Sequence, residues 1–108
     1  MQYDALLNQF DYTPNPTLKI QLKRIIENTE GFEKIEKHIV DLHDALKVDS
    51  SYVAMSNSVD FLKIKVEAPS PERTEEALEK INRFSERYKV ELEKVEGKET
   101  YYIKRFKH

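Results

Sequence analysis

The spacing of apolar residues changes once along this 108-residue chain, and that change restricts the folds it can adopt. Up to Leu46, apolar residues recur every three or four positions, as they do on one face of a helix. After a turn-forming Asp-Ser-Ser sequence at 49–51, the segment 59–67 alternates apolar with other residues, which is typical of a strand with one buried face. The buried set there is Leu62, Ile64 and Val66. The chain therefore predicts an α+β fold with helices first and strands later.

Few residues interrupt these patterns, so the element boundaries are well marked. The chain has only two glycines and four prolines. Asn15-Pro16 and Ser70-Pro71 each combine a good helix N-cap with a proline suited to the first helical position. The predicted single domain, residues 1–108, contains an N-terminal helical arm (1–13), two helices (14–48), a hairpin (51–67), a helix (70–88) and a second hairpin (89–106).

The order of the last elements suggests a topology. N-terminal helices followed by ββαββ match a permuted ferredoxin-like sandwich, in which the first strand has moved to the end of the chain. We expect the strands at 59–67 and 100–106 to lie side by side, and parallel, in the centre of a four-stranded sheet. The helices would cover one face of that sheet and leave the other face open.

The first ten residues form a candidate docking arm. Its apolar residues have helical spacing, but a helix this short is marginal alone and must dock on something. Either the rest of the domain or the open sheet face could receive it. The residues are Tyr3, Leu6, Leu7 and Phe10.

The sequence contains no residue pattern typical of a catalytic site. The chain has no cysteine, which excludes disulfides, thiolate metal sites and cysteine nucleophiles. His38 and His43 lie about 140° apart around a helix, so they cannot simply share one metal ion, and we take His43 as a surface residue. Gly31 and Gly97 are isolated and form no phosphate-binding loop. We expect no catalytic residue, no metal site and no cofactor.

The open sheet face is the candidate interaction surface. Side chains alternate between the two faces along the strand at 100–106. If Ile103 faces the helices, its neighbours in the sequence face outward, beside the outward-facing residues of the strand at 59–67. Adjacent aromatic and basic residues can stack bases and hold phosphates, so single-stranded nucleic-acid binding is the alternative function. Against it, the net charge is −2 and Glu91 and Glu93 would share the face. The candidate residues are Phe61, Lys63, Lys65, Tyr102, Lys104 and Phe106.

We therefore expect a small, non-catalytic protein-interaction or regulatory module that self-associates as a homodimer or binds a protein partner. No apolar run approaches the length of about 20 residues that spans a bilayer. Residues 1–10 carry Asp4 and no basic residue, unlike a secretory signal. Together with the absence of cysteine, this favours a cytoplasmic protein with no membrane contact. A small-molecule sensor with a pocket between sheet and helices is a third class of function, which would leave no mark in the sequence, so any small-molecule ligand is unknown.

Overall fold

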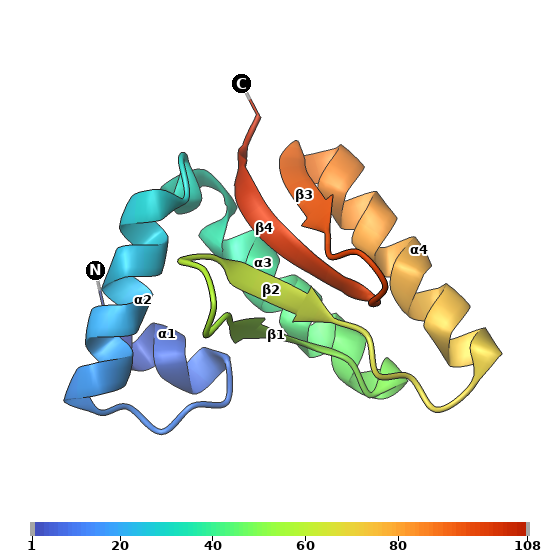
Figure 1. Ribbon diagram of the computed structural model, residues 1–108, viewed down its shortest axis with the longest axis horizontal. Helices are drawn as coiled ribbons and strands as arrows, with labels where there is room; N and C mark the ends of the chain where they lie inside the picture. The colour runs from blue at the N-terminus through green and yellow to red at the C-terminus, as the bar shows by residue number, and fades with distance from the viewer. Residues whose placement is uncertain (1, 108) are drawn as a thin grey trace.

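The computed structural model describes residues 2–107, so that Met1 of the predicted arm and His108 lie outside the described residues. Within that range the chain has an α+β fold of four α-helices, one short 3-10 helix and a four-stranded antiparallel sheet (Figure 1). The helices are α1 (Tyr3–Gln9), α2 (Pro16–Asn28), α3 (Phe32–Leu46), η1 (Lys47–Asp49) and α4 (Pro71–Tyr88). The strands are β1 (Tyr52–Met55), β2 (Leu62–Lys65), β3 (Val90–Lys94) and β4 (Thr100–Phe106).

Both predicted helix starts are confirmed by their caps. The Asn15 side chain accepts a hydrogen bond from the Leu18 backbone N–H at 2.8 Å, and Pro16 begins α2. The Ser70 hydroxyl accepts one from the Arg73 N–H at 3.2 Å before α4. These caps satisfy N–H groups that the first helical turn leaves without a partner.

The strand order is β1-β2-β4-β3, so the two strands expected in the centre do lie side by side. The expectation that they run parallel was wrong, because β2 and β4 pair antiparallel. Helix α4 connects β2 to β3, and the β3–β4 hairpin then reverses the chain. As a result β2 and β3 point the same way, with β4 inserted between them.

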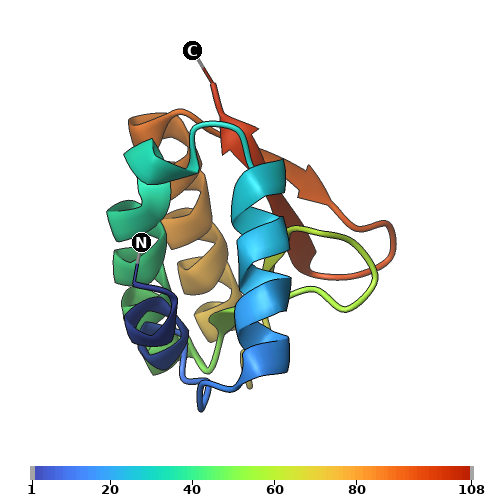
Figure 2. The ribbon, with the colours of Figure 1, turned by 90° about the vertical axis from the view of Figure 1, so that its left-hand side faces the viewer.

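Helices α3 and α4 cover one face of the sheet, while no helix of residues 2–107 crosses the other (Figures 1 and 2). The core between the layers includes Leu62, Ile64 and Ile103, each at most 1% exposed. Helix α1 lies beside α2 and α3 rather than on the open sheet face (Figure 2). Its apolar stripe is buried there, with Leu7 fully buried, as the helical spacing predicts. The alternative that the arm covers the open face was wrong.

A β-bulge changes the alternation near the end of β4. Glu91 pairs with Arg105 but Leu92 pairs with Ile103, so β4 carries one extra residue at this point. Phe106 consequently pairs with the buried Val90 and packs against the core, and the prediction that it lies on the open face was wrong. A Cβ on Gly31 would lie 2.7 Å from the Phe106 Cβ, and Gly31 has a φ of 72°, so this contact requires glycine.

Candidate functional site

An aromatic and basic cluster lies on the open sheet face. The Phe61 and Tyr102 ring centroids are 6.5 Å apart, and the Lys104 ammonium lies 4.2 Å from the centroid of the Phe61 ring. Phe61 precedes β2, and the two other residues come from β4. The lysine contact is a cation–π interaction, which holds the ring and the charge in a fixed relation. Both aromatic side chains are partly buried.

Charges of both signs surround this cluster. Register places Lys63 and Glu93 on either side of Tyr102, in one row across three strands. Ion pairs join Lys65 to Glu67 at 3.2 Å, Lys104 to Glu93 at 3.9 Å and Arg105 to Glu91 at 3.6 Å. The hydrogen bond to Glu67 raises the pKa of Lys65. Of the six residues predicted for this face, the structure brings together all except Phe106, and acidic neighbours neutralise most of their charge.

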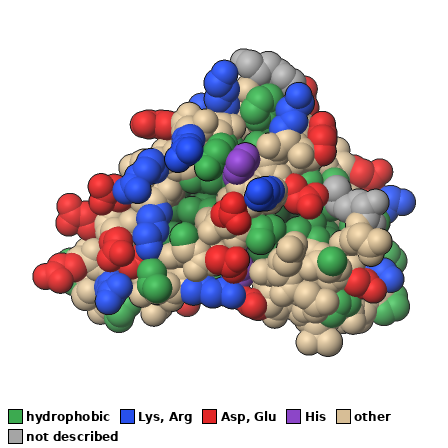
Figure 3. All heavy atoms as spheres, turned by 180° about the vertical axis from the view of Figure 1, so that it is seen from behind, with side chains coloured by type: hydrophobic (Ala, Val, Ile, Leu, Met, Phe, Trp, Pro, Cys, Tyr) green, Lys and Arg blue, Asp and Glu red, His purple; other side chains and the backbone are tan. Residues whose placement is uncertain are grey.

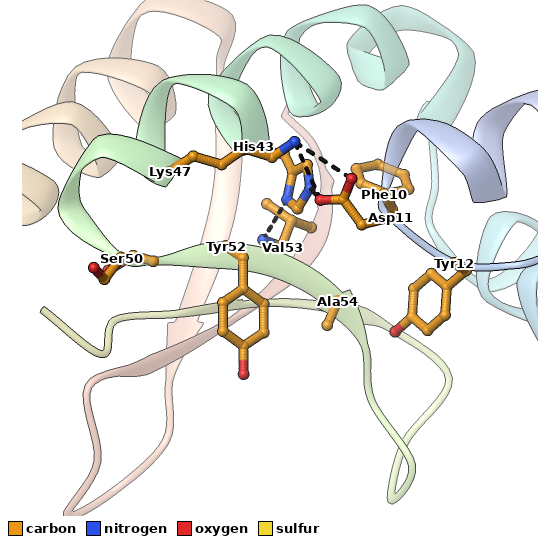
Figure 4. Close-up of a pocket in the computed structure, with 10 residues that line it drawn as sticks. Phe10, Asp11, Tyr12, His43, Lys47, Ser50, Tyr52, Val53 and Ala54 are labelled. Carbon is orange, nitrogen blue, oxygen red and sulfur yellow. Dashed lines mark hydrogen bonds and ion pairs between the residues drawn. The ribbon is translucent and has the colours of Figure 1, made fainter.

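A pocket that the sequence did not predict adjoins the edge strand β1 (Figure 4). Its volume is about 700 Å³, within the range of small-molecule sites. Residues 10–12, the end of α3 and β1 form its walls. The charged and polar groups that converge on it belong to Asp11, His43 and Lys47.

His43 is buried in this pocket with a defined hydrogen-bonding role. Its Nδ1 accepts a hydrogen bond from the Val53 backbone N–H at 2.9 Å, so the neutral ring carries its proton on Nε2 and donates it to Asp11 at 2.8 Å. The expectation of a surface histidine was wrong, since the side chain is 2% exposed. A signal existed, because Ile35, Ile39 and His43 are spaced four apart on one helical face. With both ring nitrogens engaged, His43 cannot act as a base or bind a metal without breaking these bonds.

Asp11 carries the negative charge of this pocket and contacts both His43 and Lys47. The hydrogen bond from His43, followed by that from Lys47, lowers the pKa of the Asp11 carboxyl. The Lys47 ammonium lies 3.2 Å from the carboxylate, which raises the pKa of Lys47. Asp11 itself adopts a φ of 67°, a conformation that aspartate tolerates better than most residues. Asp11 and Lys47 therefore neutralise each other, and together with His43 they tie residues 10–12 to the end of α3 and the start of η1.

The same pocket closes one edge of the sheet. The Val53 N–H donates to His43, and the Met55 N–H donates to the Tyr12 hydroxyl at 2.9 Å. An exposed edge strand would offer these donors to another chain. Two side chains thus occupy the N–H donors on the outer edge of β1 that strand addition would use.

A buried charge joins η1 to α4. The Asp49 side chain is fully buried, and Lys80 donates to it at 2.9 Å and to the Ala45 carbonyl at the same distance. Burial acts to raise the pKa of Asp49, but the Lys80 hydrogen bond and charge outweigh it and the pKa is lowered. Arg73 lies 3.6 Å from the other carboxylate oxygen, which accepts no hydrogen bond from any described residue.

Asp49→Asn is expected to destabilise the protein by about 1–3 kcal/mol at about pH 6, since it removes the negative charge that pairs with Lys80 and Arg73. A carboxyl whose folded pKa is lowered stabilises above its unfolded pKa, near 3.8, and loses that effect as the pH falls through the folded pKa. The difference from wild type should therefore shrink at about pH 2.5, as measured by urea unfolding. Asp44→Asn, an exposed control paired with Lys47, should have little effect at either pH. An equal cost at both pH values would contradict the assignment.

Other features of the described chain give no further chemistry. Among residues 2–107, no group of three or more histidine or acidic side chains is arranged to hold a metal ion. No helix in this range is long and apolar enough to cross a membrane. The face built by α3 and α4 shows basic and acidic side chains interspersed (Figure 3). No family model, no curated protein and no solved structure matches the chain.

Proposed function

We propose that this protein is a small, non-catalytic interaction module that self-associates through the open face of its sheet. The observation that carries the proposal is the cluster of Phe61, Tyr102 and Lys104 on a face that no described helix covers. Aromatic side chains often anchor interfaces, and this pair is held in place by a cation–π contact. The absence of cysteine fits a cytoplasmic setting. The strand order fits a permuted ferredoxin-like sandwich.

The hydrogen bonds of the buried His43 favour a non-catalytic role. Catalytic bases need a free nitrogen within reach of the substrate. Both nitrogens of His43 are hydrogen-bonded within the protein, and the neighbouring Asp11 is neutralised by Lys47. These groups support a structural role at the edge of β1.

The face is favoured over the sheet edges as the interface. At the β1 edge, His43 and Tyr12 already accept the outward N–H groups. At the β3 edge, a copy added antiparallel and centred on Leu92 would bring Glu91 opposite Glu93 of the other chain. Like charges directly opposite one another destabilise a strand pair. Both edges therefore disfavour continuous sheets between copies.

A protein partner is favoured over nucleic acid by the charge pattern. Nucleic-acid surfaces present cations that remain available to phosphates. Here Lys65 and Lys104 already contact acidic side chains, and glutamates line the β3 side of the face. The positive β2 side and the negative β3 side instead suit a second copy of the same face.

Sedimentation analysis over about 1–200 μM tests the proposal. The wild type should form a dimer in this range, and Tyr102→Ala should weaken it by about tenfold or more, because an interface aromatic is lost. Ile20→Ala, which truncates an exposed side chain on α2, should leave dimerisation unchanged. A wild type that stays monomeric would overturn the proposal. Salt-sensitive micromolar binding to single-stranded RNA would overturn it in favour of a nucleic-acid function.

A further inference from the structure

Resting on this proposed function, we propose that two copies pair face to face about a two-fold axis that runs along β4. Lys63 of each copy then faces Glu93 of the other, and the two Tyr102 side chains meet at the axis. The proposal names the pairing mode and the contacts that set it.

The argument begins with one row of side chains across the sheet. Register pairs Lys63 of β2 with Tyr102 of β4, and Tyr102 in turn with Glu93 of β3. Directly opposed residues in a sheet point to the same face. The row therefore consists of a cation on β2, an aromatic residue on β4 and an anion on β3, and β4 lies between the other two strands.

This row is complementary to itself under one rotation. A half turn about an axis along β4 exchanges the β2 side of the face with the β3 side. Each lysine then meets a glutamate, and the contact occurs twice because an isologous interface repeats every pair. The rotation also keeps the strands of the two sheets in the same direction, the aligned arrangement that packed sheets commonly adopt.

The other in-plane rotation is disfavoured. A half turn about an axis perpendicular to the strands would place β2 over β2 and β3 over β3. If that axis followed the row, Lys63 would face Lys63 of the second copy, and Glu93 would face its Glu93. Juxtaposed like charges are strongly unfavourable at an interface, so the charges at the two ends of the row favour the first axis.

The charged ends of the row are available for such contacts. The Lys63 side chain makes no hydrogen bond or ion pair with any other residue in the described part of the chain. Glu93 is 59% exposed, and its contact with Lys104 spans 3.9 Å, the longest of the three ion pairs described on the face. Lys104 also lies over the Phe61 ring. A second copy can therefore supply each end with a partner.

Charge reversal tests the pairing. Lys63→Glu would create glutamate pairs across the interface and Glu93→Lys would create lysine pairs, so each should raise the dimer dissociation constant by about tenfold or more. The double variant, Lys63→Glu with Glu93→Lys, restores opposite charges and should dimerise within about threefold of wild type. Lys37→Glu is the matched control, because it makes the same charge change at an exposed position on α3 and should dimerise as wild type does.

Mixing the two single variants gives the sharpest result. Under the proposed axis, both 63–93 contacts between a Lys63→Glu chain and a Glu93→Lys chain are attractive, so the mixture should form heterodimers more tightly than either variant dimerises alone. Circular dichroism checks that each variant remains folded. A monomeric wild type would overturn the proposed function and this pairing together. A wild-type dimer that Tyr102→Ala weakens, but that neither single reversal nor their mixture affects, would overturn the pairing alone.

Discussion

Phe10→Ala is expected to lower the free energy of unfolding by about 3–5 kcal/mol, the usual cost of truncating a buried phenylalanine. The Phe10 side chain is 3% exposed and packs edge-on against the His43 ring, with centroids 5.5 Å apart. Its loss leaves a cavity between the N-terminal segment and α3, and it loosens the segment that carries Asp11 and Tyr12. Urea unfolding, followed by circular dichroism, measures the change.

Phe61→Ala is the matched control for this substitution. It removes the same side chain from a partly buried position on the open face, so its cost to stability should be much smaller. Its main effect should be on self-association. Equal losses of unfolding free energy in the two variants would mean that the Phe10 side chain is packed no more tightly than the Phe61 side chain on the open face. No loss in Phe10→Ala would make the segment a passive extension.

Ile103→Ala should cost about 2–5 kcal/mol. Ile103 is fully buried in the strand between β2 and β3, and it pairs with Leu62 on one side and Leu92 on the other. Truncating it removes contacts with both strands and with the helical layer in a core that cannot readily collapse. Thermal or urea unfolding gives the measurement.

Ile20→Ala supplies the comparison for Ile103. The same atoms are removed from a side chain that is 57% exposed on α2, so the change should stay within about 0.5 kcal/mol. Ile103→Ala with a similarly small effect would contradict the register of the sheet. Tyr102→Ala should affect dimerisation more than stability, because Tyr102 points to the opposite face.

Local sequence determined the elements of this protein. Helical spacing and the caps at Asn15 and Ser70 identified where helices lie and where two of them begin. Alternation identified β2, and it assigned Ile103 to the core and Tyr102 to the open face. These properties depend on neighbours within about four residues, which is the range over which side-chain periodicity and capping act.

Tertiary structure alone decided how the elements meet. The antiparallel centre follows from which strands α4 connects, and the packing of Phe106 against the core follows from an extra residue in β4 between the partners of Glu91 and Leu92. Neither is visible in periodicity, because a bulge shifts the alternation without changing residue type. His43 became a buried link only because Asp11 and Val53, distant in sequence, approach its two nitrogens. The row from Lys63 to Glu93 likewise exists only once three strands adopt their register, since a sheet joins residues that the chain itself keeps apart.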